Sequence, residues 1–178
     1  MGKHVRTISQ SYLWGVDFLM IFVILGTQDK VFPRLLEAIQ HQIDLGNIKE
    51  KVIVQAGSTN FESKDMEIFD YISMDNFEKY IEKSDYIITH GGVGTILDSL
   101  KKNKKIITIP RLKEYGEHEN DHQLQIIAEF VKLGYVLTCD DLSDLDQTIK
   151  NLDSFTPNKY QSNNNNFVNL VRSYIDKW

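Results

Sequence analysis

Short apolar segments of strand length alternate with helical patterns along most of the chain, and this alternation limits the possible folds more than any other feature. The segments cover residues 20–25, 51–56, 68–72, 85–89, 105–109 and 135–138. They read as continuous apolar runs, which is typical of strands covered on both faces. The sequence therefore predicts an α/β fold with a doubly wound parallel sheet.

Helical patterns fill the spaces between these segments. Helices are predicted over residues 31–45, 75–83, 95–102, 121–133 and 167–177. Another helix is predicted to follow an N-cap at Ser143. In doubly wound sheets, ligands bind at the carboxyl ends of the strands, where loops meet the N-termini of helices. We therefore expect the functional residues directly after the strands.

Composition narrows the class of protein. The 178 residues, 42% of them apolar, suffice for one folded domain without a disulfide or metal. Cys139 is the only cysteine, which fits a reducing cytoplasm. The net charge of −5 argues against nucleic acid as a partner, and no apolar run approaches the roughly 20 residues that span a bilayer. We expect an N-terminal extension over residues 1–19, one domain over 20–155, and a linker with a C-terminal helix over 156–178.

The strongest local signal is the glycine turn, residues 89–95 with the sequence THGGVGT, which lies between an apolar strand and a helix. Glycines let the backbone approach a ligand closely, and free N–H groups at the positive end of a helix dipole suit a diphosphate. Ligand contacts are therefore predicted at Gly91, Gly92, Gly94 and Thr95, although such a turn can also exist to pack a strand against a helix. The turn matches neither a Walker loop nor the GxGxxG fingerprint.

Other candidates lie nearby. Asp98 follows Thr95 by one helical turn and can accept hydrogen bonds from ribose hydroxyls, although an aspartate on a helix is usually a solvated charge. Gly26 and Thr27 follow the first strand and can meet a phosphate, with a plain tight turn as the alternative. Arg111 follows the fifth strand and can offset substrate charge, with a surface role as the alternative.

Residues 118–122 spell H-E-x-x-H, the pattern of zinc hydrolases. Zinc chemistry needs both histidines one turn apart on a continuous helix, but Asn120 and Asp121 favour a helix cap, which places His118 in a loop. No third ligand is evident, so no metal is predicted. The alternative is that the loop lays His118, Asn120 and Gln123 over the strand ends, while His122 is only a packed or surface histidine.

Several motifs together resemble a known family. They are MIFV at 20–23 with Gly26-Thr27, THGGVGT at 89–95 followed by ILD at 96–98, IPR at 109–111 and GEHENDHQ at 116–123. Over residues 20–155 the chain resembles glycosyltransferase family 28 C-terminal domains, in particular PssE-like subunits of capsule and exopolysaccharide synthesis. It is also similar to the small catalytic subunit of the eukaryotic transferase that adds the second N-acetylglucosamine to a dolichol-linked precursor.

The resemblance implies a Rossmann-like domain that forms the C-terminal, donor-binding half of a GT-B glycosyltransferase. A separate, membrane-anchored chain then supplies the acceptor half at the inner face of the cytoplasmic membrane. The implied reaction transfers a sugar from a UDP-sugar to a hydroxyl of a lipid-linked saccharide. Backbone amides and a helix dipole can stabilise the leaving diphosphate, so no metal or other cofactor is expected.

The related MurG transferase implies roles for single residues. The glycine turn approaches the diphosphate, Asp98 stands where MurG has a ribose-binding glutamate, and Gln123 matches a glutamine that reaches sugar hydroxyls. The general base of MurG-like relatives lies on the other half, and His90 and His118 are the candidates within this chain, because a near-neutral pKa suits that task.

The sequence leaves two alternatives open. One is a non-catalytic nucleotide-sugar-binding or regulatory module of the same fold, and the other is a zinc hydrolase that uses His118 and His122. The apolar face left by the missing half is expected to be covered by the partner, by a homodimer or by residues 1–19.

Overall fold

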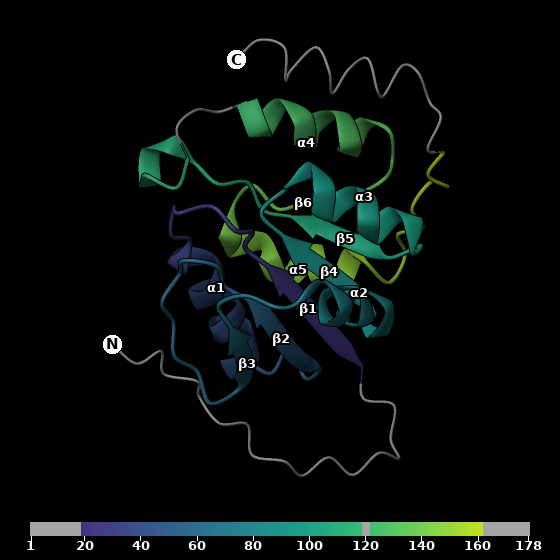
Figure 1. Ribbon diagram of the computed structural model, residues 1–178. Coiled ribbons are helices and arrows are strands. Elements are labelled where there is room, and N and C mark those ends of the chain that lie inside the picture. The colour runs from purple at the N-terminus through teal and green to yellow at the C-terminus, as the bar shows by residue number, and fades with distance from the viewer. Residues whose placement is uncertain (1–18, 119–121, 162–178) are drawn as a thin grey trace.

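The structure, a computed structural model, describes residues 19–118 and 122–161 (Figure 1). Within this part of the chain, six parallel strands form one sheet in the order β3-β2-β1-β4-β5-β6. The strands are β1 (Met20–Ile24), β2 (Lys51–Gln55), β3 (Met66–Phe69), β4 (Tyr86–Thr89), β5 (Lys105–Thr108) and β6 (Leu137–Thr138). The predicted doubly wound parallel sheet is confirmed. The predicted extension at residues 1–18 and helix at 167–177 lie outside the described residues.

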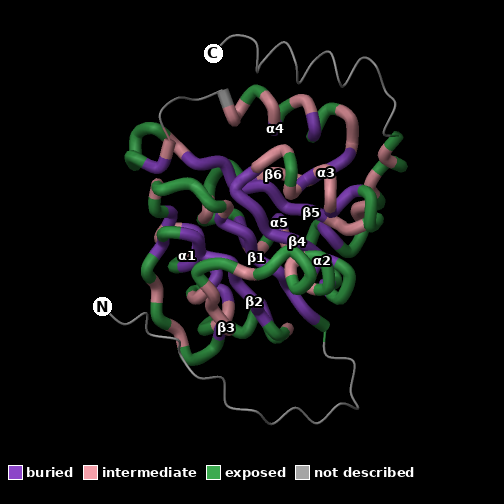
Figure 2. Tube along the Cα trace, viewed as in Figure 1, coloured by how far each residue is buried: buried purple, intermediate pink, exposed green. Residues whose placement is uncertain are grey.

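Helices cover both faces of the sheet. They are α1 (Pro33–Asp44), α2 (Met74–Lys83), α3 (Val93–Lys101), α4 (His122–Lys132) and α5 (Leu145–Asn151), with short 3-10 helices at η1 (Lys113–Tyr115) and η2 (Leu142–Asp144). One core cluster joins the sheet to α1 and α5, and a second joins it to α2, α3 and α4. Figure 2 shows the buried strands between these layers, with exposed residues on the outer sides of the helices.

The two-faced sheet explains why the central strand β1 is apolar throughout. Side chains alternate between the faces of a strand, so in β1 Ile21 and Val23 enter one core cluster while Phe22 and Ile24 enter the other. Every residue of β1 is buried. Burying one such side chain contributes about 1.5–3 kcal/mol, so a polar residue on either face would be costly.

The bounds of several elements differ from the predictions. The third strand begins at Met66, because pairing with β2 runs from Met66 to Phe69. Helix α2 begins at Met74 after Ser73, so Asp75 lies in its first turn instead of capping it. Ser143 does not cap a helix with its side chain: its N–H donates to Asp141 Oδ1 at 2.9 Å within η2, and α5 starts two residues later.

The strand order places a topological switch between β1 and β4. The chain leaves β1 toward α1 on one face and leaves β4 toward α3 on the other face. Loops diverge at such a point and leave a crevice at the carboxyl ends of the strands, where this class of sheet binds ligands. No helix in the described residues is long and apolar enough to cross a lipid bilayer.

Candidate functional site

The loops after β1 and β4 meet at the imidazole ring of His90. A Cβ atom on Gly26 would lie 2.6 Å from His90 Cε1, and one on Gly92 would lie 2.7 Å from His90 Nε2. Non-bonded atoms do not pack that closely, so the ring fits only because both positions are glycine. Packing alone therefore accounts for these two glycines. Thr27, next in the first loop, is exposed.

His90 is a neutral packing residue in this setting. The side chain is buried, and Nδ1 lies 3.3 Å from the backbone oxygen of Ile24, which fits the tautomer whose Nδ1–H donates to that carbonyl. Burial, assisted by the positive charge of Arg111, lowers the pKa of His90 to about 4. The expectation of a near-neutral pKa is therefore wrong for His90, because the ring is removed from water.

Gly91 and Gly94, the two remaining glycines of the turn, differ in whether the fold itself requires glycine. Gly91 has a φ of +90°, and a Cβ there would lie 2.4 Å from Ile127 Cδ1, so backbone geometry and packing both require glycine. Gly94 lies in the first turn of α3 and is exposed, its φ is not positive, and no neighbouring side chain or loop would lie within 4 Å of a Cβ there. Glycine costs about 0.5–1 kcal/mol relative to alanine in a helix. Neither packing nor φ explains Gly94, and the predicted contact with a ligand remains a prediction.

The N-terminus of α3 is therefore open and carries donors. The helix begins at Val93, two residues earlier than predicted, and its first backbone bond runs from Ile96 N–H to Gly92 O at 3.0 Å. The N–H groups of Val93, Gly94 and Thr95 precede that bond and have no acceptor within the helix. Together with the helix dipole they form an arrangement that binds anions.

Asp98 lies one turn beyond Gly94 on the same side of α3, since residues four apart on a helix are neighbours. Its side chain is 50% exposed, and its Oδ1 accepts from Lys101 Nζ at 2.9 Å. The predicted contact with a ribose remains a prediction. The carboxylate is within a helical turn of the open N–H groups and is held only by an exposed ion pair.

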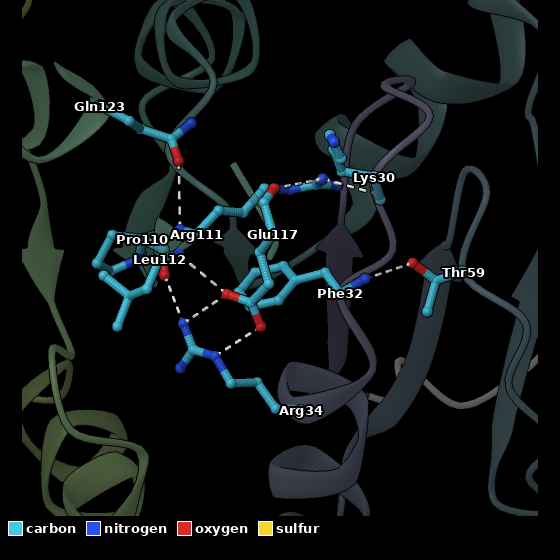
Figure 3. Close-up of polar contacts among 9 residues, drawn as sticks. All are labelled: Lys30, Phe32, Arg34, Thr59, Pro110, Arg111, Leu112, Glu117 and Gln123. Carbon is cyan, nitrogen blue, oxygen red and sulfur yellow. Dashed lines mark hydrogen bonds and ion pairs between the residues drawn. The ribbon is translucent and has the colours of Figure 1, made fainter. Parts of the chain in front are cut away.

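Arg111 takes a place that the sequence did not predict. It is 1% exposed, and its guanidinium donates to the backbone oxygen of Leu25 at 2.6 Å. It also donates to the backbone oxygen of Lys30 at 2.8 Å (Figure 3). The surface alternative is therefore wrong. The guanidinium is directed at the β1–α1 loop, so its contribution to substrate charge can only be indirect.

Gln123, in the first turn of α4, does lie at the glycine turn. A Cβ on Gly91 would be 3.8 Å from Gln123 Cγ. Gln123 Oε1 accepts the backbone N–H of Arg111 at 3.2 Å (Figure 3). The carboxyl ends of β1, β4 and β5 thus bring together Gly26, His90, Gly91, Gly92, Arg111 and Gln123.

Sequence reasoning missed the ion pair between Arg34 and Glu117. Arg34 Nε lies 2.7 Å from Glu117 Oε1, and Glu117 is almost fully buried. An arginine after a proline in the first turn of a helix looks like an ordinary solvated charge in sequence. The weak signal was Glu117 itself, which lies inside the GEHENDHQ motif.

Most of the H-E-x-x-H string, residues 119–121, lies outside the described residues. Helix α4 begins at His122, and His118 precedes it in the loop, as predicted. No group of three or more His, Cys, Asp or Glu side chains is placed to hold a metal within residues 19–118 and 122–161. Asn120 lies outside the described residues.

Comparison with known proteins identifies the family and the fold. Residues 20–177 match the glycosyltransferase family 28 C-terminal domain. The UDP-N-acetylglucosamine transferase subunit ALG13 of Candida albicans is 34% identical over 109 residues, which cover 61% of this chain and 36% of that protein. ALG13 of Saccharomyces cerevisiae is 45% identical over 56 residues, covering 32% of this chain and 26% of that one. The matched segments thus span about a quarter to a third of these curated relatives.

Two solved structures share the fold. The NMR solution structure of ALG13 has a TM-score of 0.54 at 22% identity, covering 86% of this chain and 94% of that one. The calicheamicin glycosyltransferase CalG4 has a TM-score of 0.57 at 14% identity, covering 90% of this chain and 38% of that one. The fold is that of the Rossmann-like C-terminal half of GT-B glycosyltransferases, and the chain belongs to the glycosyltransferase family 28 C-terminal domain family.

Proposed function

We propose that this chain is the donor-binding, catalytic subunit of a two-component glycosyltransferase that uses a UDP-sugar. The observation that carries the proposal is the start of α3, where Gly94 leaves open a set of backbone N–H groups directly after β4. Family membership and the names of the ALG13 relatives support a UDP-sugar as the donor. UDP-N-acetylglucosamine is accordingly the first donor to test.

The chemistry follows from this placement. The diphosphate binds against the N–H groups of Val93, Gly94 and Thr95, so negative charge that develops on the leaving group meets fixed donors and a helix dipole, and no metal or other cofactor is needed. Asp98 accepts hydrogen bonds from the ribose. Gln123 lies on the other side of the turn and can donate to the sugar, while Gly26 and Thr27 border the crevice from the β1 loop.

A separate chain completes the enzyme. One Rossmann-like domain supplies only half of a GT-B site, and the relatives are named as transferase subunits. We assign the acceptor, a lipid-linked saccharide, to a membrane-anchored partner at the inner face of the cytoplasmic membrane, in capsule or exopolysaccharide assembly. The partner also supplies the general base. Within this chain the remaining candidate for that role is His118, because His90 is too weakly basic.

A transfer assay tests this function. The chain and its partner are expressed together and supplied with radiolabelled UDP-N-acetylglucosamine and membranes that contain the acceptor. Asp98→Ala is expected to lower transfer by about tenfold or more, since it removes hydrogen bonds to a charged group. The matched control is Asp146→Ala, which breaks an exposed helical ion pair of the same 2.9 Å length with Lys150.

The two variants separate an enzyme from a passive module. Transfer lost in Asp98→Ala and retained in Asp146→Ala, with both proteins folded, supports the proposal. Equal transfer by the two variants contradicts the site, and no transfer of any UDP-sugar by the wild-type pair contradicts the enzyme.

A further inference from the structure

Two arginines fasten the loop after β5 to the loop after β1. Arg111 reaches from the β5 loop to the backbone oxygens of Leu25 and Lys30. Arg34, in the first turn of α1, reaches in the opposite direction and donates from Nη2 to the backbone oxygen of Pro110 at 2.7 Å. Hydrogen bonds therefore run in both directions between the two loops. Figure 3 shows the bonds to Lys30 and Pro110.

Glu117 completes the fastening. Its Oε1 and Oε2 lie 2.7 and 3.0 Å from Arg34 Nε and Nη2, and Oε2 also accepts the backbone N–H of Leu112 at 3.0 Å. A two-pronged arginine–carboxylate pair fixes direction as well as distance. Because Glu117 is 3% exposed, the pair is shielded from solvent, and loss of one partner would leave a buried charge.

Aromatic rings limit where the guanidinium groups can lie. The Arg34 guanidinium carbon lies 5.0 Å from the centre of the Phe32 ring and 4.9 Å from that of Tyr115, and the Arg111 carbon lies 5.4 Å from the Phe32 ring. Phe32 is itself fixed, because it is fully buried and its N–H donates to Thr59 Oγ1 at 3.0 Å. The charged network therefore has a rigid support.

One peptide unit connects this network to the glycine turn. The peptide between Pro110 and Arg111 is planar, so its C=O and N–H point in opposite directions. The C=O accepts from Arg34, and the N–H donates to Gln123 Oε1 at 3.2 Å. Since the peptide plane turns as a unit, a change at Arg34 alters the direction of the Arg111 N–H group, which donates to Gln123.

We propose that Arg34 and Glu117 are positioning residues for the donor site, which act through the Pro110–Arg111 peptide and the Gln123 side chain. With its Oε1 held by Arg111 N–H, Gln123 offers its NH₂ group, a pure donor, to a ligand at the glycine turn. Sugar hydroxyl and phosphate oxygens accept such a hydrogen bond. This inference rests on the proposed function, because it takes the glycine turn as the place where the UDP-sugar binds.

A double-mutant cycle on the full chain tests the inference, with binding of UDP-N-acetylglucosamine measured by titration calorimetry. Arg34→Met and Glu117→Gln are each expected to weaken binding about fivefold, the size of one lost hydrogen bond. In a Gln123→Ala background, neither substitution should weaken binding further, because their effect passes through Gln123. A merely structural role would weaken binding equally in both backgrounds.

Controls keep the result interpretable. Glu82→Gln makes the same substitution in an exposed ion pair with Lys102, between α2 and the end of α3, and should leave binding unchanged. If Arg34→Met does not fold, Arg34→Lys serves in the same cycle, since lysine keeps the charge but cannot contact both Glu117 oxygens and Pro110 as a planar fork does.

The outcomes distinguish the inference from the proposed function. The inference is supported if Arg34→Met and Glu117→Gln weaken binding only in the chain that retains Gln123. Wild-type binding that survives Arg34→Met and Glu117→Gln, or losses of equal size in the Gln123→Ala background, overturn the inference alone. Absence of binding of both UDP and UDP-N-acetylglucosamine by the wild-type chain overturns the proposed function and the inference together.

Discussion

His90 joins the two central loops as a neutral ring, and this makes the stability of the fold depend on pH. Its pKa is about 4 when folded and about 6.5 when the ring is exposed in the unfolded chain. Between these values the unfolded chain binds a proton that the folded chain does not, so stability is lost as the pH falls from 6.5 to 4. The loss is about 1.4 kcal/mol per pH unit, roughly 3 kcal/mol in all. Urea unfolding from pH 7.5 to 4 measures it.

The control for this prediction is His90→Gln, which keeps a polar side chain but does not titrate. Carboxyl groups elsewhere contribute equally to both proteins, so the difference between the two curves isolates the imidazole. Identical pH dependence of the two proteins would show that the ring is not buried as a neutral group.

Two glycines of the turn should respond in opposite ways to the same substitution. Gly94→Ala should raise stability by up to about 1 kcal/mol, because alanine favours the helix and its methyl group meets no neighbour, yet it should weaken UDP binding by crowding the N–H groups. Gly92→Ala should lower stability by about 1–3 kcal/mol, because its methyl group collides with His90. Thermal unfolding with and without UDP measures both effects. Unchanged UDP binding by Gly94→Ala would show that close approach of a ligand is not why glycine occupies position 94.

Local pattern predicted which loops come together but not which of their side chains are buried. The glycine turn and Gly26 directly follow strands, Gln123 lies in the helix after the β5 loop, and strand order brings these segments together. The burial of His90 and Arg111 depends on contacts between loops that are distant in sequence, so no local pattern contains it. The Arg34–Glu117 pair spans 83 positions and was missed for the same reason.

At the level of elements, the lysine-rich turn after α3 serves the fold. Lys104 Nζ donates to the backbone oxygens of Glu82 and Ser84, both at 2.7 Å, at the end of α2. Lys104→Met should therefore lower the free energy of unfolding by about 1–2 kcal/mol, because carbonyl groups at the helix end lose their donor. The control is Lys132→Met on α4, whose lysine is largely exposed and should change stability by less than about 0.5 kcal/mol. Urea unfolding of both variants measures these changes. Equal losses of unfolding free energy in the two variants would contradict this role for Lys104.

Most elements were predictable, because apolar runs and helical patterns are local properties of the chain. The errors in the predicted bounds lie at the ends of elements, because hydrogen-bond pairing with other segments determines where an element begins and ends. The β3 strand is set by its register with β2, and α3 starts at Val93 because Gly92 is extended and accepts its first backbone bond. The earlier start matters, since it moves Gly94 and Thr95 into the first turn, where their N–H groups have no helical acceptor.

For the whole molecule, the doubly wound sheet gathers the loops after β1, β4 and β5 at its switch point, where we propose that the donor binds. These loops are joined through His90, Arg111 and Arg34, so contacts within this chain organise them. We therefore expect UDP binding by this chain alone. Tight binding should raise its melting temperature, because the ligand binds the folded state.

The most direct measurement is an NMR titration of the ¹⁵N-labelled chain with UDP. A diphosphate site at the start of α3 predicts that the largest changes in amide resonances occur at Val93, Gly94 and Thr95, with smaller changes at Gln123. Unchanged resonances there, with changes gathered instead around the surface hollow beside β3 that Phe61 helps to line, would contradict that site.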